Sequence, residues 1–386
     1  MSKNKQDERE DRPVIMTRLG KAASDASVAY RRLPMVARYA INAVLVALFL
    51  VAGEALIGVK VVSRYQTGVL EQVGIYIIMA VSLNIATGYL GQLPLGHAGF
   101  MSVGGYASAI FITRMMPTMG LAAKDMATGS PAAVALFVGG IVFGGLCAAV
   151  CGLVIGIPAL RLKGDYLAII TLGFAEIIRV VITNIDSVLG FTLTGGAAGL
   201  TGIPAYSSFL NVFLVVAVTI FLIHTMMKSR HGRAVLAIRD NEIAAEASGV
   251  NTTYYKTLAF VVSAFFAGVG GALYAGCIGV MDPSKFGFMK SVEILVMVVL
   301  GGMGSMLGSV ISATVLTILP EALRAFADYR MLAYSIVLIL VMIFRPQGLL
   351  GSYDFSLSHV IERVMNRDFP WRRRRTKKTT EEVQDA

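Results

Sequence analysis

The chain has 386 residues, of which 56% are hydrophobic and 15% charged, and its formal net charge is +10. Soluble domains average about 25% charged residues, so this composition cannot cover a water-facing surface and excludes an ordinary soluble protein. The apolar residues fall in blocks of about 20, the length that crosses a bilayer as a helix. We therefore expect an all-α, polytopic transmembrane helix bundle.

Residues 1–38 form a polar segment that precedes the first apolar block and holds nine Lys or Arg against five acidic residues. A basic segment beside a membrane span favours the cytoplasmic face of the membrane over nucleic-acid binding. No cleavable signal peptide is evident. We predict a cytoplasmic N-terminus followed by an uncleaved first span.

Nine apolar blocks follow in chain order, and the charges of the loops between them indicate which side each loop faces. The loops at 158–164 and 228–256 are basic, whereas 184–206 contains no Lys or Arg, and the positive-inside rule places the basic loops in the cytoplasm. The blocks lie at about 39–58, 69–88, 93–113, 133–157, 165–183, 207–227, 257–280, 293–319 and 331–345.

The block at 293–319 is long and is interrupted by four glycines at 301, 302, 304 and 308. Single crossings throughout would leave the basic tail 346–386 outside, so we predict a broken or re-entrant helix pair near 293–319 and about 8–10 spans in total. Non-helical backbone at membrane depth needs protein or a water-filled cavity around it. The predicted organisation is a cytoplasmic segment 1–38, a transmembrane domain 39–345 and a cytoplasmic tail 346–386.

Small residues recur at four-residue spacing within several blocks, a pattern that lets helix backbones approach closely. It predicts a compact bundle. The examples are Gly104 with Ser108, Gly105 with Ala109, and Ala264 with Gly268 and Ala272.

The cytoplasmic loop 228–256 contains an alanine-rich stretch between a capping residue, Asp240, and a terminating glycine, Gly249. We predict a helix of about eight residues, with Glu242 and Glu246 on one face. So short a helix is unstable alone in water. Either a cleft on a cytosolic protein or the membrane surface would support it, and the spacing alone does not choose between them.

Ionisable and strongly polar residues within spans are the second candidate feature, because they usually face a cavity or a partner. Glu176 and Arg179 are three residues apart and are expected to pair with each other. Our candidates for a translocation pathway are Asn84, Gln92, His97 and Thr171, the first three beside Pro94 and Gly96, which can break a helix.

Catalytic motifs are missing from the sequence. There is no Walker A pattern for ATP, no nucleophile setting around the four histidines and no metal-ligand spacing among the three cysteines. We predict a chain without catalytic residues, metal or cofactor of its own.

Several segments together resemble the branched-chain amino-acid permease family of ABC importers (LivM type). They appear in the family's order and cover about residues 80–351. The matching segments are 82–84 (SLN), 88–98 (GYLGQLPLGHA), 164–173 (GDYLAIITLG), 193–203 (LTGGAAGLTGI), the loop 232–251, 299–305 (VLGGMGS) and 345–351 (RPQGLLG).

The resemblance implies a permease subunit of the bacterial cytoplasmic (inner) membrane, with both termini inside. Its implied partners are a second homologous permease, two cytosolic ATPase subunits that bind ATP, an extracytoplasmic solute-binding protein and membrane lipid, with no nucleic acid. The loop would dock in the ATPase, and the implied coupling residues are Arg239, Glu242, Ala245, Glu246 and Gly249.

The main alternative is a secondary transporter driven by an ion gradient, which would favour paired midplane carboxylates and an inverted repeat. A membrane-embedded enzyme is a third possibility. The substrate stays open among leucine, isoleucine, valine, related amino acids and amides such as urea.

Overall fold

The structure is a computed structural model that describes residues 35–59, 63–121, 126, 130–162, 164–326, 335, 336, 339, 343, 344 and 348. The chain divides into two compact units, residues 1–48 with 355–386 and residues 49–354. The first unit is described only over 35–48. The predicted segment 1–38 therefore lies almost wholly outside the described residues, as does the predicted tail 346–386 apart from Gly348.

The described residues form helices joined by loops and contain no strand, only an isolated bridge between Leu200 and Met281. This confirms the predicted all-α fold. The longer helices are α2 (Met35–Gly58), α3 (Arg64–Asn84), α4 (His97–Thr118), α5 (Pro131–Ala159), α6 (Asp165–Leu189), α7 (Phe209–Lys228) and α10 (Thr252–Ile278). The shorter ones are α8 (Arg230–Asp240), α9 (Glu242–Ala247), α11 (Phe288–Gly301) and α12 (Met306–Ala322), with single turns at Ile85–Tyr89, Gly196–Ala198, Pro283–Phe286 and Leu323–Phe326.

Five of these helices are long and apolar enough to cross a membrane by length and composition: α3 with its π-helical extension 85–89, α5, α6, α7 and α10. The other predicted spans correspond to α2, α4 and the pair α11 and α12. The predicted span at 331–345 lies largely outside the described residues.

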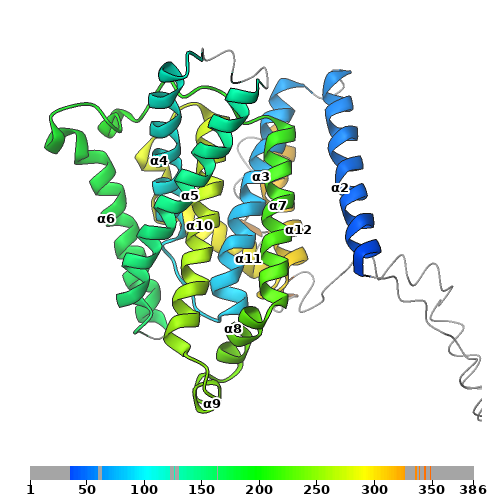
Figure 1. The fold of residues 1–386 in the computed structure, drawn as a ribbon, viewed down its shortest axis with the longest axis vertical. Coiled ribbons are helices and arrows are strands. Elements are labelled where there is room, and N and C mark those ends of the chain that lie inside the picture. Colours follow the sequence, from blue (N-terminus) through cyan, green and yellow to red (C-terminus); the bar gives the residue numbers. More distant parts are fainter. Residues whose placement is uncertain are drawn as a thin grey trace, which may run out of the picture. The chain divides into compact units, whose positions relative to one another are not determined.

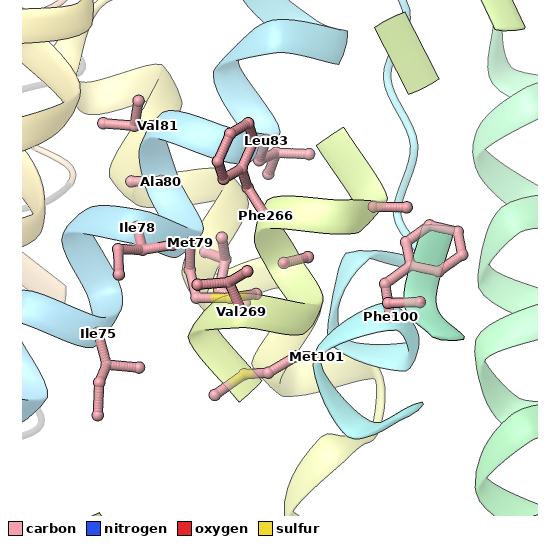
Figure 2. Packing of buried hydrophobic residues seen from close by; sticks show 14 of the residues in the cluster. Ile75, Ile78, Met79, Ala80, Val81, Leu83, Phe100, Met101, Phe266 and Val269 are labelled. Carbon is pink, nitrogen blue, oxygen red and sulfur yellow. The ribbon is translucent and has the colours of Figure 1, made fainter. Parts of the chain in front are cut away.

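Helices α3 and α10 form the centre of the bundle. Their most apolar stretches are 78% and 72% buried, against 17% for α6, which lies at the flank of the bundle (Figure 1). Every residue of α3 from Val73 to Asn84 is buried, as expected of a helix that is apolar on all sides. Its side chains pack with Phe100 and Met101 of α4 and with Phe266 and Val269 of α10 (Figure 2).

Glycines bring α4, α5 and α10 into backbone contact where they cross. A Cβ added to Gly104 would overlap the backbone of Gly268, and one added to Gly144 would lie 2.5 Å from the Gly104 carbonyl oxygen. A Cβ on Gly271 would overlap the Met101 carbonyl. The small-residue spacing therefore does produce the close approach that it predicts.

Helices α11 and α12 form an antiparallel hairpin with its tip at Gly302–Ser305. Gly301 and Gly308 are in backbone contact, and the Ser312 hydroxyl donates to the Met297 carbonyl. Gly302 and Gly304 have φ of 104° and 87°, values that favour glycine, and the Ser305 hydroxyl caps α12. The predicted broken helix pair near 293–319 is confirmed. The turn between the two helices is tight, because positive-φ glycines reverse the chain within four residues.

Candidate coupling segment and translocation pathway

The segment after α7 folds into two short helices. Ser229 caps α8 by accepting hydrogen bonds from the backbone N–H groups of His231 and Gly232. Gly232, Val235 and Ile238 are buried and recur every three residues along one face of α8. Our sequence prediction missed this helix, although a capping serine followed by that spacing is a signal for it.

Helix α9 has six residues rather than the expected eight, and its cap is Asn241 rather than Asp240. Asp240 completes α8, whereas the backbone of Asn241 is extended and its side-chain oxygen accepts from the Ala244 N–H at 3.0 Å. An Asx cap needs that extended backbone, which explains the correction. Gly249 follows the helix with a φ of 84°, as expected of a terminating glycine.

Three of the five predicted coupling residues lie within α9 and differ in what they face. Ala245 is 5% exposed and faces the bundle, and Glu242 forms a 2.6 Å ion pair with Lys256 at the start of α10. Glu246 is exposed to solvent. The exposed face also carries Ile243, 79% exposed, a residue that the sequence prediction did not single out.

The ion pair between Glu242 and Lys256 holds α9 against α10, and its two partners differ in exposure. The Lys256 side chain is 6% exposed and that of Glu242 is 28% exposed. Replacing Glu242 by alanine strands a buried ammonium, so we expect Glu242→Ala to destabilise the fold by about 3 kcal/mol. Lys256→Met leaves a partly solvated carboxylate and should cost about 1 kcal/mol. Thermal unfolding of the purified variants measures both, and equal losses would contradict this asymmetry.

Arg239, in the last turn of α8, contacts the end of α3. Its Nη1 donates to the carbonyl oxygen of Gly88 at 3.1 Å, within the π-helical turn, while Nε and Nη2 bond to Asp240. Gly91, with a φ of 76°, lies against the aliphatic part of the Arg239 side chain. Arg239 thus joins the segment α8–α9 to the break between α3 and α4.

Asn84 joins the same break to the tip of the α11–α12 hairpin. Its Nδ2 donates to the Ser305 carbonyl at 3.1 Å, and its Oδ1 accepts from the Gly304 N–H at 2.9 Å. A Cβ on Gly88 would overlap the Gly304 nitrogen, and one on Gly348 would overlap the backbone of Gly302. Arg239, Gly88, Asn84 and the hairpin tip therefore form one connected cluster, which we call the inner junction.

Thr171 and Ser291 hold the start of α4 in place. The Thr171 hydroxyl accepts from the Leu95 N–H at 3.0 Å, and the Ser291 hydroxyl accepts from the Ala98 N–H at 3.2 Å. The first N–H groups of a helix lack intrahelical partners, and the Ser291 hydroxyl of α11 satisfies one of them, that of Ala98. Thr171 of α6 holds the residue before the N-cap of α4.

His97 is a buried bracing residue in the bundle, 2% exposed. Its Nε2 lies 2.9 Å from the hydroxyl of Ser82, which in turn donates to the Met79 carbonyl. Gln92 is half-buried in the break, and its backbone N–H bonds to Ala86. Of the four pathway candidates, Asn84, His97 and Thr171 are therefore buried and bonded to neighbouring elements, and their role in a pathway stays a prediction.

A family model described as "Branched-chain amino acid transport system / permease component" matches residues 65–345. The chain belongs to this family. The match covers the helices from α3 to α12, so the permease region contains both the inner junction and the segment α8–α9. Family membership confirms the resemblance seen in the motifs, and with it the prediction of a multi-pass membrane permease, a transport subunit and not an enzyme.

Curated relatives agree with this assignment. The "High-affinity branched-chain amino acid transport system permease protein LivM" of Escherichia coli (strain K12) is 35% identical to this chain, over 75% of this chain and 71% of the relative. The protein of the same description from Salmonella typhimurium has the same identity and coverage. The permease protein LivH of Escherichia coli (strain K12) is 27% identical over 72% of the permease and 91% of the relative. No solved structure matches the chain.

Two further ion pairs lie within α6 and α11 of the permease. Glu176 and Arg179 of α6 are 2.6 Å apart, as predicted from their spacing. Lys290 of α11 pairs with Glu293 at 2.8 Å and also donates to the Tyr76 hydroxyl of α3, a contact that sequence reasoning missed because it joins residues far apart in the chain.

Proposed function

We propose that this permease imports branched-chain or related amino acids across the bacterial cytoplasmic membrane, driven by ATP hydrolysis in partner subunits. It would act with a second homologous permease, two cytosolic ATPases and an extracytoplasmic solute-binding protein. In this arrangement residues 228–256 and both termini face the cytoplasm, and residues 39–345 form the transport domain. The names of the relatives support this cargo. The basic residues of the loop 228–256 support this orientation.

The observation that carries the proposal is the connection of α8–α9 to the inner junction. The exposed face of α9 offers Ile243 and Glu246 to a partner, while Arg239, in the last turn of α8, bonds to the carbonyl of Gly88. The face of α9 that carries Ile243 and Glu246 is exposed in this chain and can bind a partner surface. A cleft on the ATPase supplies that surface.

Docking there would convert closure of the ATPases into movement of the bundle. A displacement of α9 pulls on Arg239, which shifts the π-helical turn at Gly88 and, through Asn84, the hairpin tip. ATP can drive transport only if the two states differ in access or affinity for the solute. The helix breaks at the inner junction are the elements that such a movement would open and close.

The test is ATP-dependent uptake of radiolabelled leucine by proteoliposomes that contain the complete transporter and its binding protein. Glu246→Arg reverses the charge on the exposed face of α9. Losing one charge contact of about 1.4 kcal/mol weakens binding of the ATPase tenfold. We therefore expect this variant to lose at least about 90% of uptake. The ATPase should co-purify poorly with this variant. The permease itself should reach the membrane in normal amount.

The matched control is Thr253→Arg, which adds an arginine at the same end of the bundle but on an exposed position of α10. It should transport like the wild type. Uptake that persists in Glu246→Arg would contradict docking through α9. Uptake that continues without ATP while a proton gradient is kept would instead favour a secondary transporter.

A further inference from the structure

Helix α6 carries a polar stripe that its own subunit covers only in part. Glu176, Arg179, Thr183 and Ser187 follow each other at spacings of three, four and four residues, which places them along one face of a helix. Only 17% of the most apolar stretch of α6 is buried, and the helix lies at the flank of the bundle (Figure 1).

The charged end of this stripe lies near the middle of the span. Counted along α6, Glu176 comes 11 residues after Asp165 and Arg179 comes 10 residues before Leu189, so the pair is about 15 Å from either end of the helix. The two side chains are 37% and 38% exposed. Charged groups at this depth are costly against lipid and usually face a cavity or a partner.

The ion pair leaves strong hydrogen-bonding groups unused. Arg179 bonds to Glu176 through Nε alone, and within the part of the chain that the structure describes its Nη1 and Nη2 make no hydrogen bond. The Oε1 of Glu176 is likewise unpaired there and lies 3.6 Å from the position that a Cβ on Gly287 would take. Two parallel guanidinium N–H groups match a carboxylate, and a carboxylate oxygen matches an ammonium group.

We propose that the polar stripe of α6 lines the translocation pathway, with Arg179 and Glu176 contacting the carboxylate and the ammonium group of a zwitterionic amino acid. The second permease covers the opposite wall, which removes the stripe from lipid. The assignment of the solute rests on the proposed function, whereas the exposure of the stripe to water does not.

The first experiment measures water access and needs no transport activity. In a background with Cys147, Cys151 and Cys277 replaced by alanine, single cysteines are introduced as Thr183→Cys, Ser187→Cys and, on the other flank of α6, Val181→Cys. The assembled transporter in proteoliposomes is treated on both sides with a membrane-impermeant cationic methanethiosulfonate. We expect at least about tenfold faster labelling of the two stripe positions than of Val181→Cys, because a thiolate forms only in water. Equal labelling, or faster labelling of Val181→Cys, overturns the proposal.

The second experiment measures leucine uptake by the assembled transporter. Arg179→Gln should lower the uptake rate at least about tenfold, as expected for the loss of a charge-assisted contact. The matched control is Arg324→Gln, which removes the arginine of another i,i+3 pair, Glu321–Arg324, at the end of α12 and should transport normally. The exchange Glu176→Arg with Arg179→Glu keeps an ion pair but reverses its direction, and it should stay inactive.

The outcomes separate this inference from the proposed function. Normal uptake by Arg179→Gln or by the exchanged pair means a structural salt bridge and overturns the solute contact. If Arg179→Gln does not assemble with the second permease, the labelling result alone decides whether the stripe lines the pathway. A wild-type transporter without leucine uptake refutes the proposed cargo and leaves the labelling result to stand by itself.

Discussion

Replacing Gly104 by leucine is expected to abolish accumulation of the folded permease. Any side chain there overlaps the backbone of Gly268 in α10. Helix α4 cannot move away from α10, because Gly144 of α5 already contacts the Gly104 carbonyl. Overpacking costs about 3 kcal/mol where neighbours can relax, and more here, where the obstacle is main chain. Against a total stability of about 5–15 kcal/mol, this is a large fraction.

Fluorescence-detected size-exclusion chromatography of a tagged permease measures the effect as loss of the monodisperse peak. The matched control is Gly68→Leu, at a glycine of α3 with open space around its Cα. That variant should accumulate normally, because leucine is also a better helix former than glycine by about 1 kcal/mol. A normal peak for Gly104→Leu would mean that α4, α5 and α10 do not cross as closely as their glycines indicate.

Asn84→Leu is expected to leave the permease assembled but to lower leucine uptake at least about tenfold. The substitution leaves the Gly304 N–H and the Ser305 carbonyl without their partner, at a cost of about 1–3 kcal/mol each. A movement of the end of α3 is then no longer transmitted to the hairpin tip. We expect the ATPases to keep hydrolysing ATP while transport stops, and uptake and phosphate release from the same proteoliposomes measure both.

Two further variants control for the loss of a polar group. Asn84→Asp keeps an acceptor for the Gly304 N–H but sets an oxygen against the Ser305 carbonyl, so it should also fail. Thr87→Val removes a buried hydroxyl from the same stretch, one that bonds only to Leu83 in its own helix, and should transport normally. Normal uptake by Asn84→Leu would remove the inner junction from the coupling route.

Local features of this fold could be predicted from the sequence because they depend on neighbouring residues. The apolar blocks predict the long helices, the glycines at 301–308 predict the hairpin, and Gly249 predicts the end of α9. The cap of α9 was misassigned because Asp240 and Asn241 are adjacent and both suit a cap. Only the backbone conformation chooses between them.

Contacts across the bundle could not be predicted, and they define the candidate site. Asn84 was selected as a polar residue in a span, but its partners lie more than 200 residues away in the chain. Arg239 stays a predicted contact for a partner protein, and the structure adds a hydrogen bond from its guanidinium to Gly88 within this chain. No periodicity encodes such pairings, because they depend on how α3, α8 and the hairpin come together.

The contact of Gly348 with the hairpin tip bears on how the subunit is synthesised. The tip is surrounded by residues 84–88, by Arg239 and by Gly348, so nearly the whole transport domain must leave the ribosome before its surroundings are complete. Domains emerge from the N-terminus onward, and contacts between distant parts of a chain form slowly. The inner junction is therefore among the last regions to mature, and it stays incomplete in a nascent permease that still lacks its C-terminal residues.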